Sequence, residues 1–253
     1  MVNNIGLALL LTTLAGLSTT IGSILSLFLK RPGPRFMALA LGFSAGVMVL
    51  VSFVELLQGG MEIVGFASAH LAFFAGMVGL FILDALIPHE YMAERHRVGE
   101  AQDQELLRTG LFVALGLGIH NFPEGMATFA GTLEDVKLGA AIAVAIAIHN
   151  IPKGLAIAAP IYAATGSRRK AFLWSFLSGL AEPVGATLAA TVLLPFMSRA
   201  LLGWILSGVA GIMVFISLDE LVPASRSFGE EHLSIVGVVS GMMVMAVSLW
   251  MLK

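Results

Sequence analysis

Long apolar runs separated by short polar connectors dominate the sequence. Eight such runs occur, at residues of about 4–29, 36–57, 63–87, 109–130, 138–163, 170–195, 200–222 and 233–252. Each is close to the ~20 residues that an α-helix needs to cross a bilayer. The pattern therefore predicts an all-α polytopic membrane protein with eight transmembrane helices. We expect one transmembrane domain over residues 1–253, with the charged stretch 88–108 as its longest loop.

Composition supports a membrane protein and narrows the function. The chain is 58% hydrophobic and only 12% charged, whereas soluble domains carry about 25% charged residues. It has no basic tract that would bind nucleic acid, and zero cysteines exclude disulfides and thiolate metal sites. The first apolar run is too long for a signal peptide and lacks a basic leader, so we expect it to be retained as a span.

Basic residues are distributed unequally between the two sides of the predicted membrane protein. Ten lie in the loops after spans 1, 3, 5 and 7, against three on the opposite side. Because loops rich in Lys and Arg stay in the cytoplasm, we expect the loop 88–108 to be cytoplasmic and both termini to be extracytoplasmic. We expect a multi-pass protein of the cell (inner) membrane.

Spans 2 and 7 share a pattern. Residues 45–56 and 210–221 match at seven of twelve positions without a gap, at an offset of 165. The topology makes span 2 run outward and span 7 run inward, so the pair indicates an inverted repeat, an organisation typical of transporters with midplane sites. Chance matching within a Gly-, Ala- and Val-rich alphabet is the alternative.

A second doubled pattern concerns polar residues inside the spans. HNFPEG at 120–125 is followed 29 positions later by HNIPKG at 149–154. His120, His149 and Glu182 each lie 12 residues after the basic residue that begins their span. That is about 18 Å along each helix, near the middle of the bilayer. Charged groups are costly there, so we expect these side chains to face one another or a wet cavity.

Imidazole and carboxylate groups without thiolates suit Zn²⁺, Fe²⁺, Mn²⁺ and related divalent cations. A mixed nitrogen and oxygen site with amides and water is the better match for a protein that must release its ion. The alternative is a polar packing network of His, Asn and Glu without metal.

Other polar residues mark a possible access path for a cation. Glu55 lies toward the predicted outer surface, and Asp84, His89, Asp219 and Glu220 lie toward the inner one. Met48, about 13 residues into span 2, is a candidate lining residue. Solvated helix ends are the alternative for the ionisable residues, and ordinary packing is the alternative for Met48.

The doubled motif, the eight spans and SGLAEPVGA around Glu182 resemble the ZIP (Zrt/Irt-like) divalent-metal transporters, closest to the bacterial ZupT/GufA branch. FSAGVMVLVSFVELL in span 2 and GIMVFISLDELVP in span 7 support this resemblance, which covers nearly the whole chain. It implies uptake of divalent metal cations into the cytoplasm, homodimers, alternating access between helix bundles, and no prosthetic group. The family's metal-binding positions correspond to His120, Asn121, Glu124, His149, Asn150 and Glu182.

One position departs from the family pattern, in which a second acid commonly stands where this chain has Lys153. That acid would bridge two metal ions, whereas a protonated amine cannot ligate. We therefore hypothesise a single-metal site, with Lys153 paired to Glu124 or Glu182 and replacing the charge of the second cation.

Two other functions compete with a carrier. A passive divalent-cation channel would use the same polar path. An intramembrane metal-dependent hydrolase would need a metal-held water and a general base, as in HExxH helices, but Asn follows both His120 and His149. We expect Zn²⁺ as the cargo, with Fe²⁺, Mn²⁺, Co²⁺ and Cd²⁺ as further candidates, because such a site accepts all of them.

Overall fold

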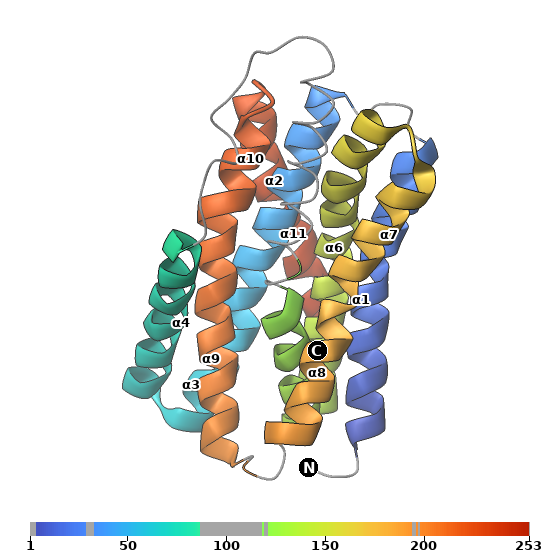
Figure 1. The fold of residues 1–253 in the computed structure, drawn as a ribbon. Helices are drawn as coiled ribbons and strands as arrows, with labels where there is room; N and C mark the ends of the chain where they lie inside the picture. The colour runs from blue at the N-terminus through green and yellow to red at the C-terminus, as the bar shows by residue number, and fades with distance from the viewer. Residues whose placement is uncertain are drawn as a thin grey trace.

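A computed structural model describes residues 4–28, 33–86, 118, 121–193, 196 and 198–252. These residues form eight helical rods that stand roughly side by side (Figure 1). In chain order the rods are α1 (Ile5–Phe28); α2 (Pro34–Val51), η2 (Ser52–Leu57) and α3 (Gln58–Val64); α4 (Phe66–Leu86); the segment 121–134; α6 (Val136–Thr165); α7 (Arg168–Gly179), α8 (Ala181–Leu188) and η3 (Ala189–Leu193); α9 (Arg199–Ile216), η5 (Ser217–Leu221) and α10 (Val222–Arg226); and α11 (Glu231–Leu252).

The helices confirm an all-helical polytopic membrane protein. They do not establish the count of eight spans. Among the described residues, five stretches are long and apolar enough to cross a bilayer: Ile5–Leu25, Pro34–Val64, Val136–Ala159, Arg199–Arg226 and Glu231–Met251. Phe66–Ile82 is a shorter apolar helix. The predicted loop 88–108 and the first part of predicted span 4 lie outside the described residues.

One predicted boundary was wrong. The sequence pattern placed a connector between spans 2 and 3 near residues 58–62, but the helix continues to Val64 and the turn comes at Gly65. Gly65 has φ 80°, a left-handed conformation that glycine adopts without steric cost. The polar residues Gln58 and Glu62 therefore lie on a helix instead of in a loop.

Polar caps set the limits of several rods. The Asp135 side chain accepts a hydrogen bond from the Leu138 amide at 2.9 Å and begins α6, which runs through Pro152 without a break until Gly166. Ser198 caps α9 in the same way through the Leu201 amide at 3.0 Å. Such caps satisfy amides that have no partner within the helix.

Packing divides the rods into two bundles. We call α1, the segment 121–134, α6, α7 and α8 the site bundle, because these elements pack on one another. The frame bundle contains α2 with η2 and α3, α4, α9 with η5 and α10, and α11, and its main pairs are α2 with α11 and α4 with α9. The two bundles meet chiefly where α2 packs on α6.

The frame bundle contains the repeat expected from spans 2 and 7. α2 and α9 begin and end at residues 165 positions apart, and both continue into a π-helical segment. The Ser52 hydroxyl donates to the Met48 carbonyl at 2.7 Å, and the equivalent Ser217 donates to the Met213 carbonyl at 2.8 Å. The two rods run in opposite directions (Figure 1). An inverted repeat therefore shapes these helices.

The repeat extends into the site bundle through α1 and α8. A Cβ at Gly22 would lie 1.8 Å from the Ile151 carbonyl oxygen, and one at Gly185 would lie 2.2 Å from the Phe122 oxygen. Gly185 follows Gly22 by 163 positions, and Ile151 follows Phe122 by 29. These close backbone approaches are interchanged by one pseudo-twofold axis, and small residues make them possible.

Gly16 and Gly179 lie beside this axis. A Cβ at either glycine would be 2.5 Å from the carbonyl oxygen of the other, and the two are again 163 positions apart. AGLSTTIG at 15–22 and SGLAEPVG at 178–185 are the matching sequences. The similarity rests on three identities, two of them glycines, which is why the sequence pattern alone did not reveal it.

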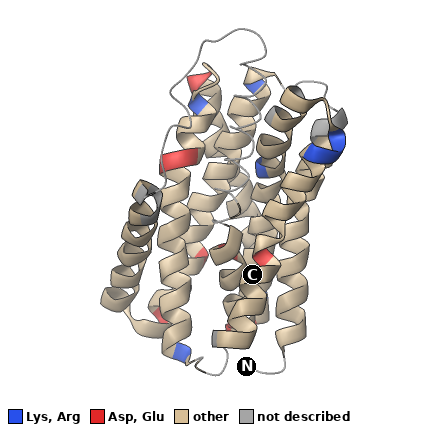
Figure 2. Ribbon diagram, viewed as in Figure 1, with Lys and Arg blue, Asp and Glu red and all other residues tan. Residues whose placement is uncertain are grey.

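The two ends of the molecule differ in charge (Figure 2). Arg35, Arg168, Arg169, Lys170 and Arg226 lie at one end, which we call the basic end. At the other end the chain turns from α3 to α4 and from the segment 121–134 to α6, and α9 begins there (Figure 1). We call this the cavity end, for the pocket described below; α1 begins and α11 ends on the same side.

Candidate metal site

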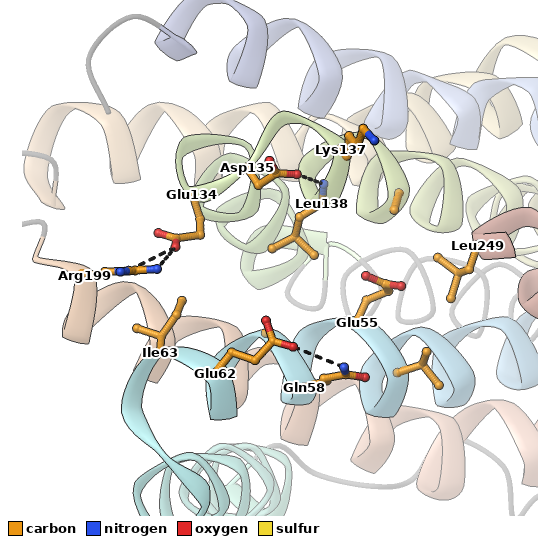
Figure 3. Close-up of a pocket in the computed structure, with 13 residues that line it drawn as sticks. Glu55, Gln58, Glu62, Ile63, Glu134, Asp135, Lys137, Leu138, Arg199 and Leu249 are labelled. Atoms are coloured by element: carbon orange, nitrogen blue, oxygen red, sulfur yellow. Dashed lines mark hydrogen bonds and ion pairs between the residues drawn. The ribbon is translucent and has the colours of Figure 1, made fainter. Parts of the chain in front are cut away.

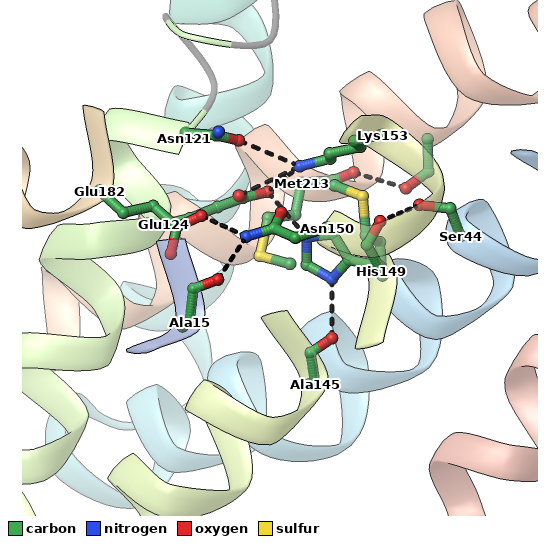
Figure 4. Close-up of polar contacts among 12 residues, drawn as sticks. Ala15, Ser44, Asn121, Glu124, Ala145, His149, Asn150, Lys153, Glu182 and Met213 are labelled. Carbon is green, nitrogen blue, oxygen red and sulfur yellow. Dashed lines mark hydrogen bonds and ion pairs between the residues drawn. The ribbon is translucent and has the colours of Figure 1, made fainter. Parts of the chain in front are cut away.

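The predicted site residues that the structure describes meet inside the site bundle (Figure 4), about halfway along α6 and along the rod of α7, α8 and η3. Asn121 and Glu124 come from the segment 121–134, His149 and Asn150 come from α6, and Glu182 comes from the first turn of α8. All five side chains are fully buried. His120, the sixth predicted ligand, lies outside the described residues.

Lys153 forms the ion pair at the centre of this group. Its Nζ lies 2.9 Å from Glu124 Oε1 and 3.1 Å from Oε2, and both side chains are fully buried. Nζ also donates to Asn121 Oδ1 at 3.4 Å. Of the two partners that the sequence left open, Lys153 therefore bonds to Glu124. The two residues occupy equivalent positions in the doubled motif, so the pseudo-twofold axis makes them face each other.

His149 is held with one ring nitrogen free. Its Nδ1 lies 2.9 Å from the Ala145 carbonyl oxygen. A carbonyl only accepts, so Nδ1 carries the proton and Nε2 of the neutral ring presents its lone pair. Nε2 lies 3.4 Å from Glu124 Oε1 but has no hydrogen-bond partner among the described residues. Metal-ligating histidines are commonly oriented by such a bond from the second nitrogen.

Asn150 joins Glu182 to α1. Its Nδ2 donates to the Ala15 carbonyl at 3.0 Å and to Glu182 Oε1. Asn121 makes the equivalent bond to the Ser178 carbonyl at 2.9 Å. Both asparagines are therefore fixed by backbone of the neighbouring helix, and the Oδ1 atom of Asn150 is left as an acceptor.

Several buried acceptors of the site lack partners. Among the described residues, His149 Nε2, Asn150 Oδ1 and Glu182 Oε2 have no hydrogen bond. Leaving such an atom buried without a partner costs about 1–3 kcal/mol. Across the described part of the chain, no three His, Asp or Glu side chains are grouped so that they could hold a metal. This agrees with Glu124 being bonded to Lys153 through both of its oxygens.

Positioning groups that sequence reasoning missed are mostly backbone atoms. The Ala15, Ala145 and Ser178 carbonyls orient the asparagines and His149, and carbonyls leave no residue-type signal. The Ser44 hydroxyl of α2 donates to the His149 carbonyl at 3.1 Å, across the bundle boundary. Its position in the FSAG stretch of span 2 was the available signal.

The predicted access-path residues that the structure describes all belong to the frame bundle. Met48 is fully buried in α2, and Glu55 is half-buried in η2. In η5, Asp219 is exposed and Glu220 is half-buried. Asp84 belongs to α4, but its side chain is not among those described, and His89 lies outside the described residues.

A cavity of about 430 Å³ opens between the two bundles at the cavity end (Figure 3). Glu55, Gln58 and Glu62 line it from the frame bundle, and Glu134 and Asp135 line it from the site bundle. It reaches inward to Ala141, which precedes His149 by eight residues, or about 12 Å along α6. The sequence pattern placed Glu55 toward the outer surface of the protein. It does not predict that residues 134–141 form the opposite wall of a cavity.

The family model and the curated relatives that match this chain agree on one family. The family model described as ZIP Zinc transporter matches residues 88–249. A protein named Zinc transporter ZupT from Streptococcus mutans is 51% identical, with 96% of each chain covered. The protein of that name from Chlorobium phaeovibrioides is 54% identical over 99% of each chain. The one from Clostridium perfringens is 46% identical, covering 98% of this chain and 96% of its own.

Proposed function

The chain belongs to the ZIP family of zinc transporters, and we propose that it carries Zn²⁺ into the cytoplasm through one midplane metal site. Divalent-metal transport, without a prosthetic group and without enzymatic activity, follows from the family. The location and stoichiometry of the site, the direction of transport and the further cations Fe²⁺, Mn²⁺, Co²⁺ and Cd²⁺ belong to the proposal.

The unpartnered acceptors are the observation that carries this site. His149 Nε2, Asn150 Oδ1 and Glu182 Oε2 supply one nitrogen and two oxygens, all buried at mid-height in the bundle. Together with His120 of the doubled motif they give the mixed nitrogen and oxygen donors that suit Zn²⁺. A bound cation would satisfy these atoms, which otherwise reduce the stability of the fold.

Lys153 limits this site to one metal ion. Its ammonium engages both oxygens of Glu124 and the amide oxygen of Asn121. In the family pattern a second acid at position 153 would bridge two ions. Here the resident ammonium supplies the second positive charge, so Glu124 contributes mainly negative potential to the neighbouring metal position.

The cavity is the proposed outer vestibule. Its carboxylates, Glu55, Glu62, Glu134 and Asp135, outnumber its cations, Lys137 and Arg199. A cavity wall of this charge attracts cations. The positive-inside rule supports a cytoplasmic basic end and extracytoplasmic termini. Met48 lies two helical turns inward from Glu55 along α2 and η2, between the vestibule and the mid-height site. The cell membrane, the lipid bilayer as surroundings and a homodimer complete the proposal.

Uptake into proteoliposomes tests the site. We expect saturable Zn²⁺ uptake that falls at least about tenfold in His149→Ala and Glu182→Gln, as is common when a ligand or its orienting partner is lost. Ser207→Ala is the matched control, because Ser207 Oγ is also buried without a partner among the described residues but belongs to α9. Undiminished uptake in both site variants would reject the assignment.

The same vesicles separate a carrier from a passive channel. A carrier saturates as the external cation rises, because each transport cycle moves one bound ion, whereas channel flux continues to grow. A panel of the five cations, with and without a proton gradient, gives selectivity and coupling. Light scattering from the detergent-solubilised protein tests the homodimer.

A further inference from the structure

An ion pair crosses the boundary between the bundles at the cavity end. Arg199 begins α9 of the frame bundle, and Glu134 ends the segment 121–134 of the site bundle. Arg199 Nη2 and Nε lie 3.0 Å and 3.2 Å from Glu134 Oε1. Figure 3 shows the pair along one side of the cavity, with Glu55 and Lys137 farther along it. The contact therefore links the two bodies whose relative movement would change this cavity.

The pair breaks the internal symmetry of the molecule. The repeat relates Arg199 to Pro34, 165 positions earlier, and Glu134 to Ala163, 29 positions later. Neither Pro34 nor Ala163 carries a charge, so the equivalent contact at the basic end cannot be an ion pair. In an inverted-repeat transporter the two access states arise when the repeats exchange conformations. A contact present at one end alone favours one of these states over the other.

The basic end has an ion pair of a different kind. Arg35 Nε lies 3.1 Å from Glu230 Oε1, joining the start of α2 to the residue before α11. Both elements belong to the frame bundle and pack closely on each other. Movement of one bundle against the other would leave this contact intact, which makes it a natural control.

We propose that Arg199 and Glu134 form a latch that favours the conformation seen here and must open when the site bundle moves against the frame bundle. The inference rests on the proposed function as a carrier, in which the two bundles move against each other during each transport cycle. Displacement by more than a few ångströms separates the two charges, and both are then hydrated. The Arg199 side chain is 71% exposed, so the pair is weak enough to open in every cycle. Exposed pairs contribute about 0.2–1 kcal/mol.

Distances between spin labels at the cavity end test the latch. The chain has no cysteine, so Phe66→Cys in α4 and Lys137→Cys in α6 can be labelled in the otherwise native protein. Both positions are exposed and belong to opposite bundles. We expect Arg199→Glu or Glu134→Arg to lower the population at the distance given by this structure, relative to the alternative distance, by up to about fivefold.

Charge exchange separates the latch from a general loss of structure. The double variant Arg199→Glu with Glu134→Arg should return the distance distribution to that of the unmodified protein, and Arg35→Glu should leave it unchanged. The proposal would be overturned if neither Arg199→Glu nor Glu134→Arg altered the distribution of spin-label distances. It would also be overturned if the double variant had the same distribution as the single variants. The measurement uses neither metal nor transport, so a failure of the metal site would appear in the uptake assay alone.

Discussion

Lys153 is the residue in which this chain differs most clearly from a two-metal transporter. Its ammonium lies fully buried 2.9 Å from Glu124, where an isolated charge would be severely destabilising. The sequence predicted the pairing but left Glu124 and Glu182 as alternatives. The pseudo-twofold axis decides between them, because equivalent residues of adjacent motifs face each other, and that axis emerges only from helix packing.

The buried pair predicts a strongly coupled effect of mutation. Lys153→Met should lower the free energy of unfolding by about 3–5 kcal/mol, because it leaves Glu124 buried without its counter-charge. Glu124→Gln combined with Lys153→Met removes both charges and should be markedly less destabilised than the sum of the two single variants. Thermal unfolding in detergent measures the difference, and additive effects would argue against the pair.

Helix packing places the site residues at one height, and glycines permit that packing. A Cβ at Gly154 would lie 1.9 Å from the Thr19 carbonyl oxygen, and one at Gly125 would lie 2.0 Å from the backbone carbonyl oxygen of Glu182. These glycines end the two copies of the doubled motif. The motif therefore combines polar side chains with the small residue that brings a neighbouring helix against them.

Alanine substitutions test this role of glycine. Gly154→Ala should lower stability by about 1–3 kcal/mol or more, since the added methyl overlaps backbone that cannot move away easily. It should also weaken zinc binding, because α1 and α6 would separate near Asn150. Gly79→Ala is the matched control, as a Cβ there meets nothing within 4 Å. Equal melting temperatures and zinc affinities for the two variants would contradict this account.

At the level of elements, the sequence predicted most helices and missed specific boundaries. The 165-residue repeat between α2 and α9 was readable because seven of twelve positions match. The 163-residue repeat between α1 and α8 was not, because its contacts are made by backbone and small residues. Gly65 rather than Gln58 ends the second rod, since polar residues facing a cavity look like a connector in a hydrophobicity pattern.

The whole molecule consists of two bundles that share a cavity and a polar site close to their boundary. The apolar runs and the low fraction of charged residues predicted a membrane protein. The division into bundles depends on which helices pack together, and no local pattern contains that information. The proposed carrier mechanism depends on this division, because a carrier requires one body to move against the other.

Cross-linking tests that movement. A Cβ at Gly59 of the frame bundle would lie 3.7 Å from Leu138 Cδ2 of the site bundle. A disulfide between Gly59→Cys and Leu138→Cys should therefore stop uptake, and reductant should restore it. Gly60→Cys with Ser207→Cys joins α3 to α9 inside the frame bundle and should leave uptake largely intact. Full uptake through the oxidised boundary pair would favour a channel.

The central claim is a single metal site in which Lys153 takes the place of a second cation. Equilibrium zinc binding to the purified protein, counted as tightly bound ions per chain, tests it most directly. We expect one tight ion in the unmodified protein, none when His149→Ala and Glu182→Gln are combined, and a second ion when Lys153→Glu supplies the bridging acid. Two tight zinc ions per unmodified chain would contradict the account.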